Sequence, residues 1–223
     1  AAVLKYTKDK YLLFATDMLI QGKHFDRTAK AELVGRKSMS CNISDIAAMG
    51  GIPKYALVSI AINRNTDVKL LDGIYRGMKA LAKKFGVNIV GGDMSRSKKT
   101  VIDISLIGEV EKKNLVMRRG AKEGDMIFVT GSIGGSQKGK HLKFIPRIKE
   151  SRQLVKNPNL TSMIDISDGL LLDLGRILDQ SRAGAIIFQD LVPISKAASS
   201  FDKAVTDGED FELLFTMSPR EAD

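Results

Sequence analysis

The chain has 223 residues, of which 43% are hydrophobic and 27% charged, a composition typical of a globular protein that can bury a core. Its net charge is +9, but the lysines are scattered and no tryptophan is present to stack on bases, which favours a solvated basic surface over a nucleic-acid-binding module. The single cysteine excludes an internal disulfide, no apolar run reaches the ~18 residues of a membrane-spanning helix, and no export signal is visible, so the sequence predicts a cytoplasmic protein without a membrane partner.

The first half of the chain alternates predicted strands and helices. An apolar run predicts a strand over Tyr11–Thr16, and a small-residue segment followed by two glycines predicts a helix over Ser38–Met49. Apolar residues at helical spacing predict a helix over Val68–Phe85 that ends at Gly86. Further strands are predicted over Tyr55–Ile62, Val87–Val90 and Val101–Val110.

A basic, turn-rich stretch from Glu111 to Gly124 predicts a domain boundary. Beyond it, helices are predicted over Gly169–Gln180 and Lys196–Val205. Strands are predicted over Met126–Thr130, Met163–Ile166, Ala185–Phe188 and Phe211–Met217. The pattern indicates an α+β protein with one domain over residues 1–112 and an α/β domain over residues 113–223.

Five aspartates lie in or beside these apolar elements, at Asp17, Asp45, Asp93, Asp165 and Asp168. Any one of them alone is more often a helix cap or a solvated acid. Gathered carboxylates repel one another unless cations neutralise them, and Mg²⁺ is a hard cation that takes carboxylates, water and phosphate oxygens. The set therefore predicts a magnesium site.

Other polar residues could contact a ligand. His24 follows Asp17 by seven residues, Glu209 and Asp210 precede an apolar strand, and Arg118 with Arg119 could form a phosphate fork. A core or surface histidine, a turn before a strand and two solvated arginines are the structural alternatives.

The sequence lacks the motifs of several common classes of catalytic site. Gly134 to His141 resembles a P-loop, but it lacks the Ser or Thr that holds magnesium, and Pro146 interrupts the helix that should follow. The chain also shows no zinc motif and no Ser-His-Asp signature. A phosphate oxygen is already ionised as a nucleophile and needs alignment and charge neutralisation instead of proton removal. The missing catalytic residues are therefore compatible with metal-assisted phosphoryl transfer.

Six motifs in order resemble one family, thiamine-monophosphate kinase, within the aminoimidazole-ribonucleotide-synthetase-like ATP-binding superfamily. The motifs are TDMLIQGKHF, NISDIAAMGGIP, GGDMSRS, RRGAKEGD, DISDGLLLDLGRI and GEDFELLF. The resemblance implies transfer of a phosphoryl group from ATP to thiamine monophosphate with several Mg²⁺ ions, as the last step of thiamine diphosphate synthesis. It also implies a homodimer whose N-terminal domains share a β-barrel.

The resemblance also implies roles for single residues. Magnesium ligands match Thr16, Asp17, Asp45, Asp93, Asp165 and Asp168, of which Asp17, Asp45 and Asp168 are the expected catalytic residues. Nucleotide contacts match Tyr75, Gly92, Asp93, Arg118 and Ser167. Substrate contacts match His24 and one acid of Gly208–Phe211, for which Glu209 is the first choice.

The sequence departs from the family pattern in places. An acidic Gly-Asp-Asp segment expected before Ala1 and an aromatic segment expected towards the C-terminus are not in the sequence, and Ala15 and Met94 replace hydroxyl residues. Another superfamily activity, of the selenophosphate-synthetase or hydrogenase-maturation kind, and a noncatalytic nucleotide-binding relative remain the alternatives.

Overall fold

The computed structural model describes residues 1–219. The chain divides into two compact units. Unit 1 comprises Ala1–Ile46 and Ile52–Glu111, and unit 2 comprises Ala47–Gly51 and the chain from Lys112 onward. Both units combine helices with strands, which confirms a mixed fold of both kinds of element. The roles predicted for domains 1–112 and 113–223 stay predictions, and residues 220–223 lie outside the described part.

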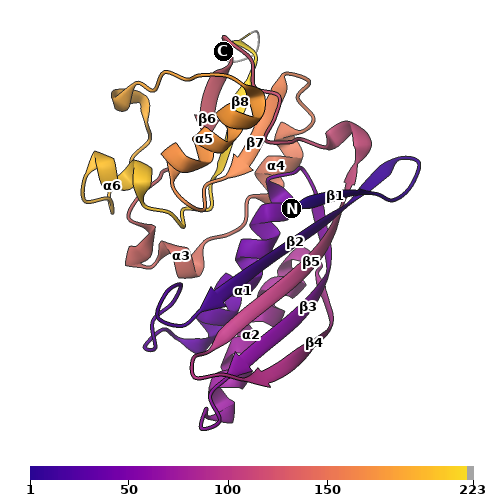
Figure 1. Ribbon diagram of the computed structural model, residues 1–223, viewed down its shortest axis with the longest axis vertical. Coiled ribbons are helices and arrows are strands. Elements are labelled where there is room, and N and C mark those ends of the chain that lie inside the picture. The colour runs from indigo at the N-terminus through magenta and orange to yellow at the C-terminus, as the bar shows by residue number, and fades with distance from the viewer. Residues whose placement is uncertain (220–223) are drawn as a thin grey trace. The chain divides into compact units, whose positions relative to one another are not determined.

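Unit 1 is built on an open five-stranded sheet (Figure 1). The strands are antiparallel except for β3 and β4, which pair in parallel. No closed barrel is present among the strands that the structure describes. In spatial order the strands are β1 (Ala2–Lys5), β2 (Lys10–Ile20), β5 (Val101–Glu111), β3 (Ile52–Ile62) and β4 (Asn88–Arg96).

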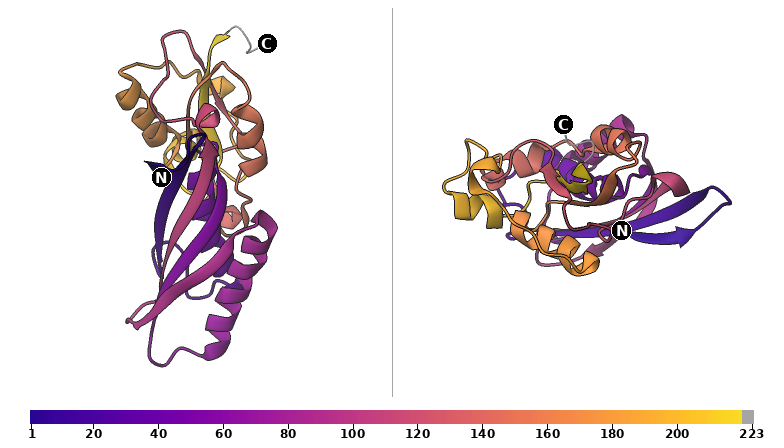
Figure 2. Two further views of the ribbon diagram at one scale, coloured as in Figure 1. Left: turned by 90° about the vertical axis from the view of Figure 1, so that its right-hand side faces the viewer. Right: turned by 90° about the horizontal axis from the view of Figure 1, so that it is seen from above.

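Strict alternation gives this sheet two different faces. In β5 every second residue is buried, from Ile102 to Val110, so that one face supplies the core. Two helices, α1 (Ala31–Ala47) and α2 (Val68–Phe85), lie along that face (Figure 2). Helix α2 has the predicted bounds, because the Asp67 side chain caps its first turn and Gly86 ends it in the left-handed conformation.

Glycines let α1 and α2 approach until their backbones touch. A Cβ on Gly35 of α1 would collide with the carbonyl oxygen of Ile74, and a Cβ on Gly77 of α2 would collide with that of Glu32. Each helix thus presents a glycine to the backbone of the other. Because backbone carbonyls cannot move aside as a side chain tip can, this contact fixes the spacing of the helix pair.

Unit 2 has a three-stranded antiparallel sheet in the order β6 (Met126–Val129), β8 (Leu213–Met217) and β7 (Leu160–Asp165). Its helices are α3 (Lys140–Lys143), α4 (Ile148–Leu154), α5 (Leu170–Ser181) and α6 (Phe201–Thr206), with single turns at Lys112–Asn114, Ser136–Lys138 and Gln189–Leu191. The central strand β8 is buried along its whole length. None of the helices described in either unit is long and apolar enough to span a bilayer.

Several predicted elements are wrong in extent or type. No strand forms over Ala185–Phe188, where Ile186 and Phe188 are exposed instead of pairing in a sheet. The helix predicted over Lys196–Val205 is only α6, because Ser200 caps its first turn and so fixes its start. Helix α1 begins at Ala31, before the predicted Ser38. Strands β2 and β4 both continue past the aspartates that were expected to follow them, Asp17 and Asp93.

The helix contact yields a stability prediction. Gly77→Ala should lower the free energy of unfolding by about 2 kcal/mol, because the new methyl group must displace the backbone of α1. Gly175→Ala is the matched control in helix α5, where nothing lies within 4 Å of the added Cβ. The control should stabilise by roughly 0.5–1 kcal/mol. Urea unfolding measures both variants, and equal stability of Gly77→Ala and the unmodified chain would contradict the close contact.

Candidate functional site

Thr16 and Asp17 are neighbours in β2 and therefore point to opposite faces of the unit 1 sheet. Thr16 lies on the exposed face, where its hydroxyl donates to Asp103 Oδ1 at 3.2 Å. Asp17 lies on the face that the helices cover, and it is only half-buried. The two residues are thus adjacent in sequence but present their oxygens on different sides.

Asp93 and Asp103 flank Ser59 on the exposed face of the same sheet. The register pairs Ser59 of β3 with Asp93 of β4 and with Asp103 of β5. Asp103 was not among the predicted site residues, although the polar positions that alternate along β5 could have indicated it. Gly92 was expected to face a nucleotide phosphate. Packing alone also requires a glycine there, because a Cβ would collide with the backbone of Val58.

The loop after β2 positions His24. The backbone N–H of Ile20 donates to His24 Nδ1 at 2.9 Å, so the neutral ring carries its proton on Nε2. The fully buried Lys37 of α1 donates to the backbone carbonyl of His24 at 2.6 Å. Sequence reasoning missed Lys37, because a lysine in a helix is normally taken as solvated.

Two other predicted residues of unit 1 lie on its helices. Asp45 is near the end of α1, where its carboxylate is 3.5 Å from the amino group of Ala1. Tyr75 lies in the middle of α2 and is half-buried.

In unit 2, a buried aspartate shapes the loop between β7 and α5. Asp173 is fully buried and accepts the backbone N–H groups of Ser167 and Asp168, each at 2.9 Å. Arg176 pairs with Asp173 and reaches Asp168 at 2.7 Å. Burial raises the pKa of Asp173, partly offset by these donors. Asp173 was not predicted, yet it determines where Ser167 and Asp168 lie.

The GEDFE segment, residues 208–212, lies directly beside the loop between β7 and α5. The N–H of Glu209 donates to the carbonyl of Ser167, and that of Phe211 donates to the carbonyl of Ile166, both at 2.8 Å. Gly208 permits the contact, since a Cβ would collide with the Ser167 carbonyl. The structure therefore brings together the predicted residues Asp168, Ser167 and Glu209, with the nearly buried Asp165 at the end of β7.

The acids of this segment have different surroundings. Asp210 is fully buried, and it accepts the Gly134 N–H and, at 2.6 Å, the Ser136 hydroxyl. Burial raises the pKa of Asp210 as well. The Gly134 amide of the P-loop-like stretch is therefore occupied by the protein's own carboxylate. Asp210 has no surface to offer a substrate, which leaves Glu209 as the more accessible acid.

Glu212 is the third acid of the segment and is almost completely buried. Arg147 binds it through two nitrogens, at 2.7 and 3.0 Å. Lys140 and the Thr130 hydroxyl each donate to it at 2.9 Å. A carboxylate with this many donors serves to hold the surrounding chain in place.

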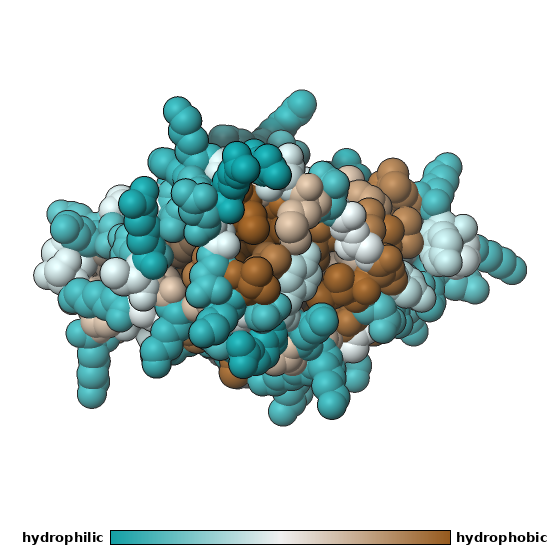
Figure 3. All heavy atoms as spheres, turned by 90° about the horizontal axis from the view of Figure 1, so that it is seen from below, coloured by the Kyte–Doolittle hydropathy of each residue, from teal (hydrophilic) through white to brown (hydrophobic). Residues whose placement is uncertain are grey.

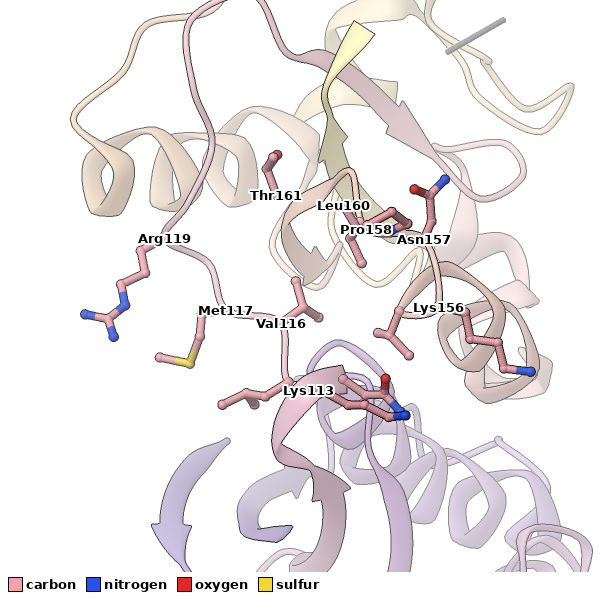
Figure 4. Close-up of a pocket in the computed structure, with 12 residues that line it drawn as sticks. Lys113, Val116, Met117, Arg119, Lys156, Asn157, Pro158, Leu160 and Thr161 are labelled. Carbon is pink, nitrogen blue, oxygen red and sulfur yellow. The ribbon is translucent and has the colours of Figure 1, made fainter. Parts of the chain in front are cut away.

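The backbone of Arg118 lies far from Asp168. Its carbonyl lies near Ser181, at the opposite end of α5 from Asp168, roughly 18 Å along the helix. A cavity of 540 Å³ also lies in unit 2 and has Lys113, Arg119 and Lys156 among its lining residues (Figure 4). Of the residues that the sequence offered for ligand binding, only Arg119, the second arginine of the possible phosphate fork, is among the described residues that line this cavity. Within residues 1–219, no three His, Cys, Asp or Glu side chains are grouped closely enough to hold a metal ion by themselves.

Comparison with known proteins adds independent information. Residues 1–110 match the family model of the AIR synthase related protein, N-terminal domain. The thiamine-monophosphate kinase of Rhodopirellula baltica is 41% identical over 93% of this chain and 68% of its own length. The corresponding protein of Buchnera aphidicola subsp. Schizaphis graminum is 36% identical over 99% of this chain and 76% of its own length.

The solved structures give the same result. The structure described as AaThiL complexed with AMPPCP and TMP superposes with a TM-score of 0.92 at 31% identity, covering 100% of this chain and 80% of that one. The hydrogenase maturation protein HypE in complex with ATP superposes with a TM-score of 0.81 at 21% identity, covering 100% and 72%. At that identity the second likeness shows a shared fold only.

The Asp173 interactions yield a second prediction. Asp173→Asn keeps an oxygen for the two amides but loses the charge that pairs with Arg176, whereas Asp173→Leu loses both. The free energy of unfolding should fall for both variants, and the leucine variant should lose more, about 3 kcal/mol. Asp179→Leu, an exposed position on the same helix, should change it by less than about 0.5 kcal/mol. A leucine variant at 173 as stable as the parent chain would refute this role.

Proposed function

Because this chain belongs to the thiamine-monophosphate kinase family, we propose that it transfers the γ-phosphoryl group of ATP directly to thiamine monophosphate, giving thiamine diphosphate and ADP. The observation that carries the proposal is the contact of two motifs in unit 2. The Ser167–Asp168 loop and Glu209 are joined by a backbone hydrogen bond, so the loop that we propose to bind nucleotide and the acid that we propose to bind substrate lie side by side.

Magnesium suits the oxygen donors that the chain offers. Asp168 and Asp93 are exposed carboxylates, and Thr16 adds a hydroxyl. Mg²⁺ usually takes one or two carboxylates and completes its coordination with water and phosphate oxygens. The proposed ligands are Thr16, Asp17, Asp45, Asp93, Asp165 and Asp168. When bound, the ions would neutralise phosphate charge.

Asp168 is the most accessible of these donors in unit 2. Its side chain is 51% exposed and pairs with Arg176, which is itself 36% exposed. Solvent weakens such a pair, so a divalent cation can compete with the guanidinium for the carboxylate. Meanwhile Asp173 keeps the backbone of residues 167 and 168 in place. The loop is therefore fixed while the Asp168 carboxylate stays available.

The other residues would bind and orient the two anionic reactants. Ser167, Tyr75, Gly92 and Arg118 are the proposed nucleotide contacts, and His24 and Glu209 the proposed contacts with thiamine monophosphate. Glu209 would face the positively charged thiazolium-containing part of the substrate. No residue has to remove a proton, because the attacking phosphate oxygen is already ionised. The chain's contribution is to align the reactants and balance their charges.

A homodimer is proposed on the exposed face of the unit 1 sheet. The register places Phe14, Ile107 and Tyr55 in one row across three strands, with Leu57 next to Tyr55 on the same face of β3. Phe14, Tyr55 and Leu57 are 40%, 48% and 48% exposed. The space-filling view shows hydrophobic residues gathered in patches between hydrophilic ones (Figure 3). Apposition of two such faces would bury these side chains and form the proposed shared β-barrel.

The metal-ligand proposal predicts a loss of turnover. Asp45→Asn and Asp168→Asn should each lower thiamine diphosphate formation at least ~10²-fold, since each removes a negative charge proposed to hold the cation that would neutralise the transferred phosphoryl group. Asp72→Asn and Asp179→Asn, at exposed helix positions, are the matched controls and should keep parental rates. The assay follows thiamine diphosphate formed from ATP and thiamine monophosphate with Mg²⁺.

Two results would count against this proposal. Parental rates in both Asp45→Asn and Asp168→Asn would remove the metal-ligand assignment. An intact, folded chain that forms no thiamine diphosphate under these conditions would remove the proposed reaction itself.

The dimer proposal predicts a change of mass in solution. Phe14→Lys combined with Tyr55→Lys should convert a dimer into a monomer, because the charges would be buried unpaired in the interface. Val68→Lys adds a charge at an exposed position on α2 and should leave the dimer intact. Sedimentation equilibrium distinguishes the two masses. A parent chain that is monomeric at micromolar concentration would contradict the proposal.

A further inference from the structure

The segment that contains His141 contacts the GEDFE segment through residues on both sides of the histidine. Before it, Lys140 donates to Glu212 at 2.9 Å. After it, the rings of Phe144 and Phe211 stack with centroids 4.1 Å apart and an interplanar angle of 6°. Together with the two bonds from Arg147 to Glu212, these contacts fix the position of the short helix α3 relative to residues 209–212.

The backbone of the GEDFE segment is itself unusual. Glu209 and Phe211 have positive φ angles of 67° and 51°, which are costly for residues with a side chain. The intervening Asp210 turns inward and is fully buried, whereas Glu209 keeps 21% of its side chain exposed. Such strained residues persist only where the surrounding structure determines their conformation, so the backbone at Glu209 is held in place.

The Glu209 carboxylate meets the imidazole of His141. Nδ1 of His141 lies 2.9 Å from Oε2 of Glu209, and the two side chains are 13% and 21% exposed. The His141 ring is mostly buried, and contacts of the residues on either side hold its backbone, so few side-chain rotamers are open to it. The acid is therefore held at its backbone by Ser167 and at its carboxylate by His141.

We propose that His141 is a positioning residue that orients Glu209 for thiamine monophosphate. His141 does not have to touch the substrate; it donates from Nδ1 to the carboxylate and so presents that carboxylate in a single direction. The inference rests on the proposed role of Glu209 as a substrate contact. If this is so, His141, for which the sequence predicted no role, helps to determine the affinity for thiamine monophosphate.

Steady-state kinetics with both substrates tests this role. His141→Leu should raise KM for thiamine monophosphate roughly 10- to 100-fold, the effect of losing one hydrogen bond to a charged group. The KM for ATP and kcat should change less than about twofold, because the nucleotide-binding loop is held by Asp173. A loss of packing alone would instead affect both substrates.

Two conservative variants separate donor position from ring volume. The amide nitrogen of asparagine can take the place of Nδ1, whereas that of glutamine reaches the place of Nε2. His141→Asn should therefore recover most of the affinity for thiamine monophosphate, and His141→Gln should not. Thermal unfolding of each variant confirms that it is folded, and the Asn and Gln pair decides the matter if the leucine variant does not fold.

The result also separates this inference from the proposed function. If Glu209→Gln raises KM for thiamine monophosphate and His141→Leu does not, the positioning role is overturned while the function stands. In the Glu209→Gln background, His141→Leu should add little, because its partner has already changed. If Glu209→Gln leaves KM unchanged, the assignment of Glu209 fails and the positioning role fails with it.

Discussion

The arrangement of unit 2 depends on one constraint: an ionised carboxylate can leave water only where donors or cations replace its hydration. Asp210, Glu212 and Asp173 satisfy it with backbone amides, hydroxyls, Lys140 and two arginines. Each of these acids joins segments distant in sequence or fixes a loop. Breaking one partnership would leave a buried charge uncompensated, so the donors and the acids have to be retained together.

This constraint separates two kinds of acid. Buried carboxylates hold the framework, and the more exposed ones, Asp168 and Glu209, are presented by it. A metal ion or a cationic substrate can reach only the second kind without dismantling hydrogen bonds. Unit 1 differs from unit 2, because Thr16, Asp93 and Asp103 stand on an exposed sheet face. Water can hydrate the carboxylates there, in addition to the hydrogen bond from Thr16 to Asp103. Apart from the buried Asp165, the carboxylates proposed to bind metal are therefore ones that the fold leaves at least partly exposed.

Sequence reasoning succeeded where a signal was local. Helix α2 was predicted with its bounds, because its apolar residues recur at helical spacing and Gly86 directly follows its last residue. The motifs that indicated the family were also contiguous. Three residues, Lys37, His141 and Asp173, were missed because their importance depends on burial or on partners elsewhere in the chain, which a single segment does not reveal. The alternation along β5 marks Asp103 as a surface position, but not its contact with Thr16. Ala185–Phe188 was misread for a related reason, since an apolar run becomes a strand only when a neighbouring strand pairs with it.

The separation of framework acids from available acids can be observed directly. Crystals grown with Mn²⁺ in place of Mg²⁺ and a nonhydrolysable ATP analogue would locate the metal by its anomalous scattering. We expect the peaks to have oxygens of exposed carboxylates, Asp168 among them, as ligands, and Asp210, Glu212 and Asp173 to keep their present hydrogen bonds. Manganese bound by any of these three buried acids, or bound with no carboxylate of this chain, would contradict the division of roles on which the proposed mechanism rests.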